Sequence, residues 1–377
     1  MEPAKQSAIP SQAISLPAES YGKQIPPFHF SFVKKSRIFL MPLFFALVFP
    51  AASVPNFLNA AEAEQEVRLF LKNLPQDLSR KQIAAMQKAK QGNSAPLEAI
   101  RLARPDTPPP AGVQIRNTTL NGVPVRIYHP EKAPEKPLKT VLYLHGGGWV
   151  IGNLKTCSRF CGELCAAEKV IVIAVDYRLA PEHPYPAALE DVMRVLKAAR
   201  SPLPDLPDGI KNDPERIFLA GDSAGGNLAA AAALKEYDQT GKTPAGVLLF
   251  YPVTDLSDRN SLSRQRYGKG YALDADLMDA FLDCYLPAGK QTHEIRYLSP
   301  LKTDLSSFPP ALIVTSEYDI LHDQGCAFAE ALKQKKRRVI HHDYKGAVHI
   351  FITVPGMDSF FRRAVHDAAS FLREFKS

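Results

Sequence analysis

The sequence predicts an α/β fold with a mostly parallel central sheet flanked by helices. Six short apolar runs alternate with longer stretches of helical spacing, and they lie at 140–144, 170–175, 216–220, 246–251, 311–315 and 339–344. Most of the runs are almost continuously apolar, as expected of parallel strands that are buried on both faces. The length of 377 residues suits one α/β unit with additional helices, and the 45% hydrophobic content allows a large buried core.

The chain ahead of these strands is predicted to be mainly helical. Residues 60–90 show helical spacing, and residues 95–103 are a candidate continuation of the same helix. A proline-rich link at 104–110 then separates this part from the rest. Two strand-like runs follow at 113–116 and 123–128, and the Asn-Gly pair between them is typical of a tight hairpin turn.

The first 63 residues resemble a leader with a secretory signal. Three cations in 34–37 precede twelve apolar residues at 38–49, and small residues follow, including Ala-Glu-Ala at 61–63. This order is that of a signal peptide, and the apolar stretch is too short for a typical transmembrane helix. We therefore expect an exported protein, periplasmic or secreted, without stable membrane insertion after processing of the 34–63 segment. The alternative is a helix that is buried or anchors the chain in a membrane.

The part of the leader before Lys34 is longer than a signal peptide needs. One hypothesis is that translation starts at or near Val33, and that the upstream residues do not belong to the protein.

Charge and cysteine patterns point away from nucleic acids and metals. The net charge of +7 is spread along the chain, and its densest cluster, at 333–338, ends a helical pattern where cations complement the helix dipole. We expect a solvated helix end there and no nucleic-acid partner. Of five cysteines, Cys157, Cys161 and Cys165 recur every four residues, which favours one buried helix face over a metal site. Export would permit a disulfide, but the spacing dictates no pairing.

A serine between two glycines predicts a nucleophile. Ser223 lies between Gly221 and Gly225, directly after the strand at 216–220 and before a helix rich in small residues. A nucleophile elbow requires this order, because its tight turn leaves no room for side chains beside the serine. The free N–H groups at the helix N-terminus would stabilise an oxyanion. The alternative is an ordinary turn.

A glycine loop follows the strand at 140–144. His145 precedes Gly146, Gly147 and Gly148, which let backbone N–H groups approach a ligand closely. The Lys-Ser/Thr pair of a phosphate-binding loop is absent. Together with the elbow, the loop predicts an oxyanion hole built from these three glycines and Ala224.

Three motifs together resemble one known family. They are His-Gly-Gly-Gly-Trp at 145–149, Tyr-Arg-Leu-Ala-Pro-Glu-His-Pro-Tyr-Pro-Ala at 177–187, and Gly-Asp-Ser-Ala-Gly-Gly-Asn at 221–227. Chains with these motifs are similar to the hormone-sensitive-lipase-like α/β-hydrolases, bacterial esterase family IV, and the similarity covers about 109–377. It implies an α/β-hydrolase fold, an N-terminal helical cap, carboxylesterase activity on short and medium acyl esters, and no metal or organic cofactor.

The resemblance also implies the catalytic acid and base. In this fold the chain order is Ser, acid, His. Asp319 takes the place of the acid, although Ile320 stands where the family usually has proline. His349 takes the place of the base, and Ile350 stands where glycine is usual, which narrows the space behind the imidazole. Other carboxylates and histidines are rivals by residue type: Glu317, Asp323, His183, His322, His341 and His342.

The sequence thus predicts a serine carboxylesterase that acts on a small-molecule ester through an acyl-enzyme. An amidase or deacetylase would use the same triad. A non-catalytic binding protein, such as the plant gibberellin receptors that resemble this family, would lack the histidine. A homodimer is left open. The predicted organisation is a leader at 1–63, a helical cap at 64–108, and a catalytic domain at 109–377 with a cap insert at 255–297.

Overall fold

The computed structural model describes residues 60–375 except for 133, 205, 208 and 287–294. The signal-like segment therefore lies outside the described residues up to position 59. No helix in the described part of the chain is long and apolar enough to cross a membrane. All the elements below belong to one compact unit, Pro55–Ser377.

The centre of this unit is an eight-stranded sheet with the order β1-β2-β4-β3-β5-β6-β7-β8. β1 and β2 are antiparallel to their neighbours, and the other strands are parallel, so the predicted mostly parallel sheet is confirmed. The strands are β1 (Val113–Leu120), β2 (Val123–Pro130), β3 (Leu138–Leu144), β4 (Ile171–Val175), β5 (Asn212–Asp222), β6 (Gly246–Phe250), β7 (Ala311–Tyr318) and β8 (Val339–Val348).

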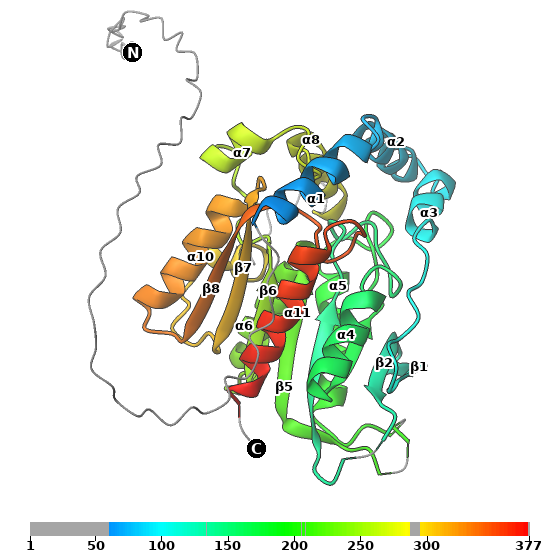
Figure 1. Cartoon of the computed structure of the whole chain (residues 1–377), viewed down its shortest axis with the longest axis vertical. Coiled ribbons are helices and arrows are strands. Elements are labelled where there is room, and N and C mark those ends of the chain that lie inside the picture. Colours follow the sequence, from blue (N-terminus) through cyan, green and yellow to red (C-terminus); the bar gives the residue numbers. More distant parts are fainter. Residues whose placement is uncertain (1–59, 133, 205, 208, 287–294, 376–377) are drawn as a thin grey trace, which may run out of the picture. The chain divides into compact units, whose positions relative to one another are not determined.

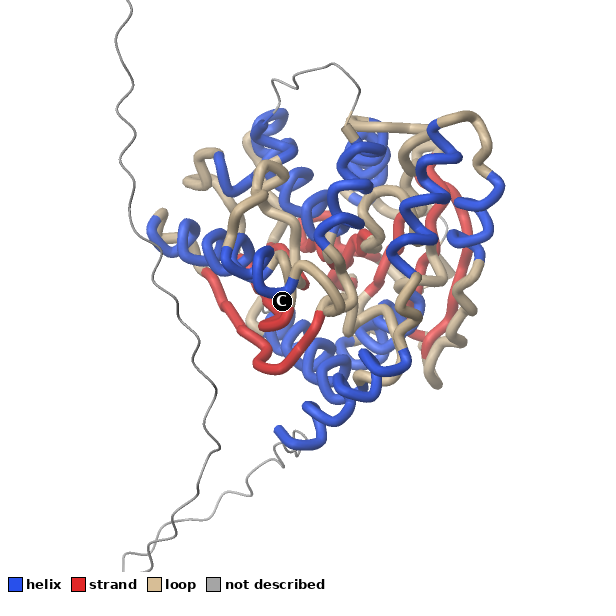
Figure 2. Tube along the Cα trace, turned by 90° about the horizontal axis from the view of Figure 1, so that it is seen from above, coloured by secondary structure: helices blue, strands red, loops and turns tan. Residues whose placement is uncertain are grey.

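Helices cover both faces of the sheet (Figure 1). One face carries α4 (Ser158–Glu168) and α11 (Asp358–Arg373), and the other carries α5 (Ala187–Ala199), α6 (Ala224–Thr240) and α10 (His322–Gln334). Figure 2 shows the strands as the layer between them. Because side chains alternate along a strand, Leu219 joins the apolar core on one face, while Phe218 and Ala220 join the core on the other.

The predicted hairpin is confirmed. Leu120 pairs with Val123 across a two-residue turn. Both turn residues have positive φ, 48° at Asn121 and 77° at Gly122, as a type I′ turn requires.

The helical segment expected at 60–90 is two helices, α1 (Ala60–Asn73) and α2 (Leu78–Lys90). Pro75 lies between them and has no N–H to continue a helix. α1 packs on β8 and α11, whereas α2 packs on α8 (Ala275–Tyr285) and on α3 (Ala95–Leu102), which is a separate helix. All three helices lie at the end of the sheet where the parallel strands finish, with α1 beside β8 (Figure 1).

The insert after β6 contributes helices to the same side of the molecule. It contains α7 (Leu262–Tyr267), α8, the short α9 (Ile295–Leu298) and a 3-10 turn, Pro300–Lys302. Ser79 on α2 donates a hydrogen bond to Asp274 at the start of α8, with an O–O distance of 2.7 Å. Lys90 forms an ion pair with Asp283 at the other end of α8. These contacts join the N-terminal helices to the insert.

The cysteines of the four-residue repeat are buried, and the basic cluster lies at a helix end, as expected. Cys157, Cys161 and Cys165 lie at one face of α4 and are buried in the apolar core, and burial raises the pKa of Cys165 to about 12. All five cysteines are free thiols. The basic cluster at 333–338 closes α10, where Lys335 pairs with Asp304.

Candidate active site

The elbow at the end of β5 holds Ser223 in a strained conformation. Its φ is 55° and its ψ is −120°, and α6 begins at the next residue. A side chain at Gly225 is impossible, because its Cβ would lie 1.9 Å from the carbonyl oxygen of Leu144. The strain presents the serine side chain at the carboxyl end of the sheet, as the motif predicts.

Ser223, His349 and Asp319 form an unbroken line of hydrogen bonds. The serine Oγ lies 2.9 Å from His349 Nε2, and His349 Nδ1 lies 2.6 Å from Asp319 Oδ2. All three residues are buried, at the ends of β5, β7 and β8. With the proton on Nδ1 directed at Asp319, Nε2 would be the acceptor for the serine hydroxyl.

The rival carboxylates are engaged elsewhere. Glu317 accepts a hydrogen bond from the N–H of Gly346 at 2.8 Å, and Asp323 accepts one from the N–H of Ser263 at 2.9 Å. Asp319 is thus the acid that the structure brings to the imidazole of His349.

The rival histidines also have other partners. His322 lies between Asp323 and Asp343, and His342 contacts Asp367. The remaining two are His341, which bonds Thr315, and His183, whose N–H bonds the Leu179 carbonyl. None of these four lines the pocket around Ser223.

Asp222, which the sequence interpretation did not single out, anchors the glycine loop. Its Oδ1 accepts hydrogen bonds from the N–H of Gly146 at 3.0 Å and from the hydroxyl of Tyr143 at 2.9 Å. Burial raises the pKa of this carboxyl to about 6, against the lowering effect of these hydrogen bonds. Its position beside the serine in Gly-Asp-Ser was the only available signal.

This contact corrects the predicted oxyanion hole. The N–H of Gly146 is directed at Asp222 and is not available to a substrate oxygen. The N–H groups of Gly147 and Gly148 donate to no described residue, and Ala224 is the first residue of α6, where N–H groups lack helical acceptors. These three remain the candidate donors. Gly147 has a φ of 116°, which residues with side chains rarely adopt.

The motif at 177–187 supports the glycine loop from behind. Tyr177 stacks on His145, with ring centroids 4.3 Å apart, and its hydroxyl donates to the His145 carbonyl at 2.6 Å. The guanidinium of Arg101 on α3 binds Glu182 and the carbonyls of Val150 and Ala180. The loop is therefore held by Asp222 of β5, by Arg101 of α3 and by this turn.

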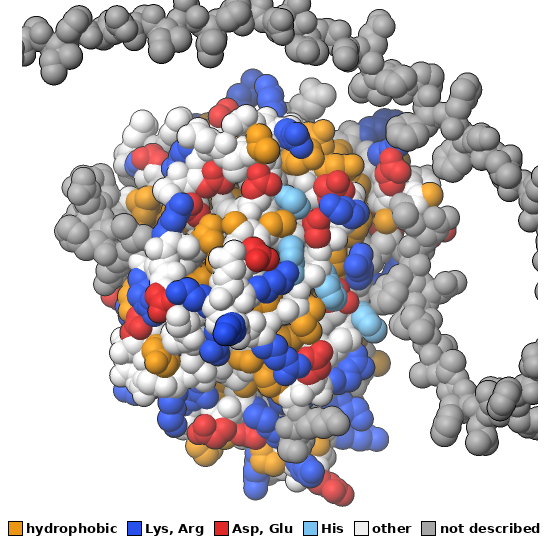
Figure 3. Space-filling model, turned by 90° about the vertical axis from the view of Figure 1, so that its left-hand side faces the viewer, with side chains coloured by type: hydrophobic (Ala, Val, Ile, Leu, Met, Phe, Trp, Pro, Cys, Tyr) orange, Lys and Arg blue, Asp and Glu red, His pale blue; other side chains and the backbone are white. Residues whose placement is uncertain are grey.

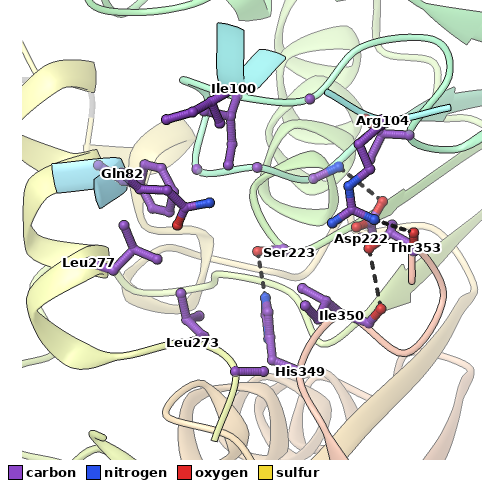
Figure 4. A pocket seen from close by; sticks show the side chains of 18 of the residues that line it. Gln82, Ile100, Arg104, Asp222, Ser223, Leu273, Leu277, His349, Ile350 and Thr353 are labelled. Atoms are coloured by element: carbon purple, nitrogen blue, oxygen red, sulfur yellow. Dashed lines mark hydrogen bonds between the residues drawn. The ribbon is translucent and has the colours of Figure 1, made fainter. Parts of the chain in front are cut away.

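A pocket of about 360 Å³ opens above Ser223 (Figure 4). Its walls are mainly apolar and come from the glycine loop, α2, α3, the insert and the loop after β8. The apolar side chains that line it are Leu78, Ile100, Ile151, Leu273, Leu277, Met278, Phe281 and Ile350. Gln82 and Arg104 add polar groups. The volume is in the range of small-molecule binding sites.

Ile350 lies in the pocket wall beside the base, as expected from its place after His349 (Figure 4). Its φ is 65°, which is uncommon for a β-branched residue and explains why glycine suits this position. Its carbonyl accepts the N–H of Thr353 at 2.9 Å and so closes the turn that follows the base.

Comparisons with known proteins identify related chains. A family model described as "alpha/beta hydrolase fold" matches residues 141–353. "Carboxylesterase NlhH" of Mycobacterium tuberculosis is 40% identical over 216 residues, which are 56% of this chain and 66% of that protein. The chain thus spans about two thirds of the length of this relative. "Arylesterase" of Saccharolobus solfataricus is 36% identical over 235 residues, 62% of this chain and 74% of that protein.

Solved structures are similar over more of the chain. Ester-hydrolase EH1AB1 from the metagenome of Lake Arreo has a TM-score of 0.68 at 31% identity and covers 81% of this chain and 97% of its own. The esterase of Pyrobaculum calidifontis has a TM-score of 0.66 at 32% identity, with 81% and 97% covered.

Proposed function

The chain belongs to the alpha/beta hydrolase fold family, and we propose that it is a serine carboxylesterase that hydrolyses short- to medium-chain esters. The line of hydrogen bonds from Ser223 through His349 to Asp319 carries this proposal. The relatives support it, because they are named carboxylesterase, arylesterase and "Ethyl acetate hydrolase".

In the first half of the reaction, Ser223 Oγ attacks the ester carbonyl carbon while His349 Nε2 takes the serine proton. Asp319 stabilises the imidazolium that forms. The negative charge on the carbonyl oxygen is held by the N–H groups of Gly147, Gly148 and Ala224. Each such donor is typically worth about 100- to 1000-fold in turnover.

In the second half, the carbon–oxygen bond to the alcohol breaks, and the alcohol leaves with the proton from His349. Water then attacks the acyl-enzyme, again giving its proton to His349. The carboxylic acid is released as the bond to Ser223 breaks, and the serine recovers its proton.

The pocket supports a limit on acyl length. Its volume is about 360 Å³, and Leu277 and Phe281 of α8 are among the apolar side chains that line it. A bounded apolar pocket contacts a short acyl chain fully, and a longer chain gains nothing once it must bend or protrude. The optimum is at or below about eight acyl carbons, without interfacial activation.

A hydrolysis profile over p-nitrophenyl esters of two to sixteen acyl carbons tests the proposal, with p-nitroacetanilide as the amide control. Activity should be greatest on short esters and lost in Ser223→Ala, which keeps the small residue that the elbow requires. Retention of more than a few per cent of turnover would move the nucleophile elsewhere. Preference for the anilide would favour the amidase alternative, and preference for emulsified long-chain triacylglycerol would favour a lipase.

Export remains part of the proposal, and the signal-like pattern at 34–63 supports it. Cell fractionation followed by N-terminal sequencing of the active protein should give an exported chain that starts near residue 64. Recovery of residues 1–30 on the mature protein would contradict both processing and the alternative start near Val33.

A further inference from the structure

The pocket above Ser223 contains a guanidinium without a carboxylate partner. Arg104 follows α3, and its side chain points into the cavity (Figure 4). It donates a hydrogen bond to the carbonyl of Thr353 at 2.6 Å. Within the described part of the chain, no Asp or Glu oxygen lies within 4.0 Å of this guanidinium. Other arginines, such as Arg101, have a carboxylate oxygen within this distance.

Arg101, which also lines the pocket and lies one helical turn earlier, differs from Arg104 because carboxylates neutralise its charge. Its guanidinium binds Glu98 and Glu182 together with two backbone carbonyls. Burial lowers its pKa, but the two carboxylates outweigh burial and raise the pKa above its ordinary value. For Arg104, burial outweighs the raising effect of the more distant Asp222 and lowers the pKa, although a guanidinium stays charged at neutral pH.

The nearest acid of the pocket does not neutralise Arg104 directly. Asp222 also lines the cavity, but its Oδ1 accepts the hydrogen bonds of Gly146 and Tyr143, and it lies beyond ion-pair distance of the guanidinium. The other titratable side chains of the pocket are Arg101 and His349, and both have partners. Arg104 therefore supplies the unpaired positive charge of a mainly apolar cavity.

A half-buried charge without an ion-pair partner, as at Arg104, is costly, and a ligand of opposite charge would offset that cost. A guanidinium presents its N–H donors in a planar fork that fits a carboxylate with two parallel hydrogen bonds. Only one of these donors is used by Thr353. The apolar walls beside it can contact a short hydrocarbon spacer between that carboxylate and the ester carbonyl over Ser223.

We propose that this pocket selects esters that carry a carboxylate, such as monoesters of short dicarboxylic acids, and that Arg104 binds the carboxylate. This inference rests on the proposed esterase function and names the substrate class of the same site. The ester bond is cleaved by Ser223 as in the neutral case, and Arg104 takes no part in the bond changes.

The test compares charged with neutral esters of similar size. In one arm the carboxylate is on the acyl part, with mono-p-nitrophenyl glutarate against p-nitrophenyl pentanoate. In the other arm it is on the alcohol part, with 4-acetoxybenzoate against its methyl ester. The measured quantity is the ratio of kcat/KM for the charged ester to kcat/KM for the neutral one, in the wild type, Arg104→Gln, Arg104→Lys and Arg104→Glu. Arg68→Gln, an exposed arginine of α1, is the matched control.

We expect the ratio to exceed one in one arm of the wild type and to fall about 10- to 100-fold in Arg104→Gln, as for a lost hydrogen bond to a charged group. Arg104→Lys should keep an intermediate ratio, and Arg104→Glu should turn the preference toward a cationic ester such as acetylthiocholine. The ratio should not change in Arg68→Gln.

Two results would overturn the proposal. One is a wild-type ratio below one in both arms. The other is an equal loss of kcat/KM on charged and neutral esters in Arg104→Gln. That result would mean that Arg104 acts only through its hydrogen bond to Thr353. If the variants do not fold, competitive inhibition of the wild type by free glutarate is compared with inhibition by the neutral glutaramide. Stronger inhibition by glutarate would support the proposal, and equal inhibition by both would contradict it. Failure of the wild type to hydrolyse any ester would instead contradict the proposed function.

Discussion

At the scale of single residues, Asp222 connects the nucleophile to the glycine loop. Its carboxyl is buried and accepts the N–H of Gly146 and the hydroxyl of Tyr143. The carboxyl thereby fixes the turn that carries the candidate oxyanion donors. Burial outweighs these hydrogen bonds and raises its pKa to about 6, from an ordinary value of 3.8.

The raised pKa of Asp222 predicts a pH dependence of stability. Between pH 3.8 and about 6, the folded protein holds a proton on this carboxyl that the unfolded chain has lost. The free energy of unfolding that this carboxyl contributes therefore falls as the pH rises through this window. Across the whole window the loss in the free energy of unfolding is about 3 kcal/mol, at 1.36 kcal/mol per pKa unit. Asp222→Asn should remove this part of the pH dependence in urea unfolding between pH 4 and 7. An unchanged profile would show that the carboxyl does not titrate there.

Asp319 and Asp323 are four residues apart but have different neighbours. Asp319 binds His349 Nδ1 at 2.6 Å, whereas Asp323 binds the N–H of Ser263. Asp319→Asn should lower kcat by about 10⁴-fold, the loss measured for the same change in a serine protease, because the amide favours the wrong tautomer. Asp323→Asn and Glu317→Gln should keep most of the activity. Equal losses at Asp319 and Asp323 in steady-state kinetics would leave the acid unassigned.

Cys326 on α10 is predicted to be the reactive thiol of the chain. Its Sγ lies 3.6 Å from His322 Nε2, and Asp343 and Asp323 flank this imidazole, whose pKa is raised to about 11, first by Asp343. Burial raises the pKa of the thiol, but His322 and His341 outweigh it and lower the pKa to about 6. Figure 3 shows histidines at the surface on this side of the molecule.

At pH 7, iodoacetamide should therefore alkylate Cys326 much faster than the buried Cys157, Cys161 and Cys165, as peptide mass spectrometry can measure. The rate should be half-maximal near pH 6. His322→Gln removes the cation and should slow alkylation at pH 7 by about 10-fold or more. A half-maximal pH near 8.5, the ordinary thiol value, would contradict the predicted thiolate.

At the scale of elements, the features that depend on local sequence could be predicted. The central strands follow from continuous apolar runs, and the hairpin follows from Asn121-Gly122, because each signal acts within a few residues. Ser223, Asp319 and His349 were chosen through motifs and chain order, and they lie within hydrogen-bond distance of one another. The packing of α1 on β8 could not be foreseen, because it depends on contacts with residues nearly 300 positions away. For the same reason, the bond between Asp222 and Gly146 was missed.

α8 lines the pocket, and Phe281 is its side chain nearest to the glycine loop. The Phe281 ring lies so close to the glycine loop that a Cβ on Gly148 would be 2.2 Å from it. Phe281→Ala should open the cavity and raise the ratio of kcat/KM for octanoate over butyrate p-nitrophenyl esters by about 5- to 10-fold. The cavity should also cost about 3–5 kcal/mol of stability. Leu262→Ala on α7, where the side chain is exposed, is the control, and an unchanged ratio would remove Phe281 from the acyl pocket.

At the scale of the whole molecule, the sheet topology brings distant parts of the chain to one edge. Ser223, Asp319 and His349 follow three parallel strands, so their side chains meet where the strands end. The helices that line the pocket come from two parts of the sequence: α2 and α3 precede the strands of the sheet, and α8 lies between β6 and β7. Every one of these parts lies within the compact unit Pro55–Ser377.

This arrangement predicts that residues 1–54 are dispensable for catalysis and for the fold. A variant that begins at Pro55 keeps both apolar cores, the triad and all the pocket walls. Its kcat/KM on p-nitrophenyl butyrate should be within about twofold of the full chain, and its Tm within about 2 °C. A variant that begins at 104 is the comparison, because it lacks α1–α3 and exposes the apolar faces of α8 and α11, and it should lose stability and chain-length selectivity. A large loss of Tm already in the variant that begins at Pro55 would mean that the leader contributes to the folded enzyme, and it would argue against removal of that segment on export.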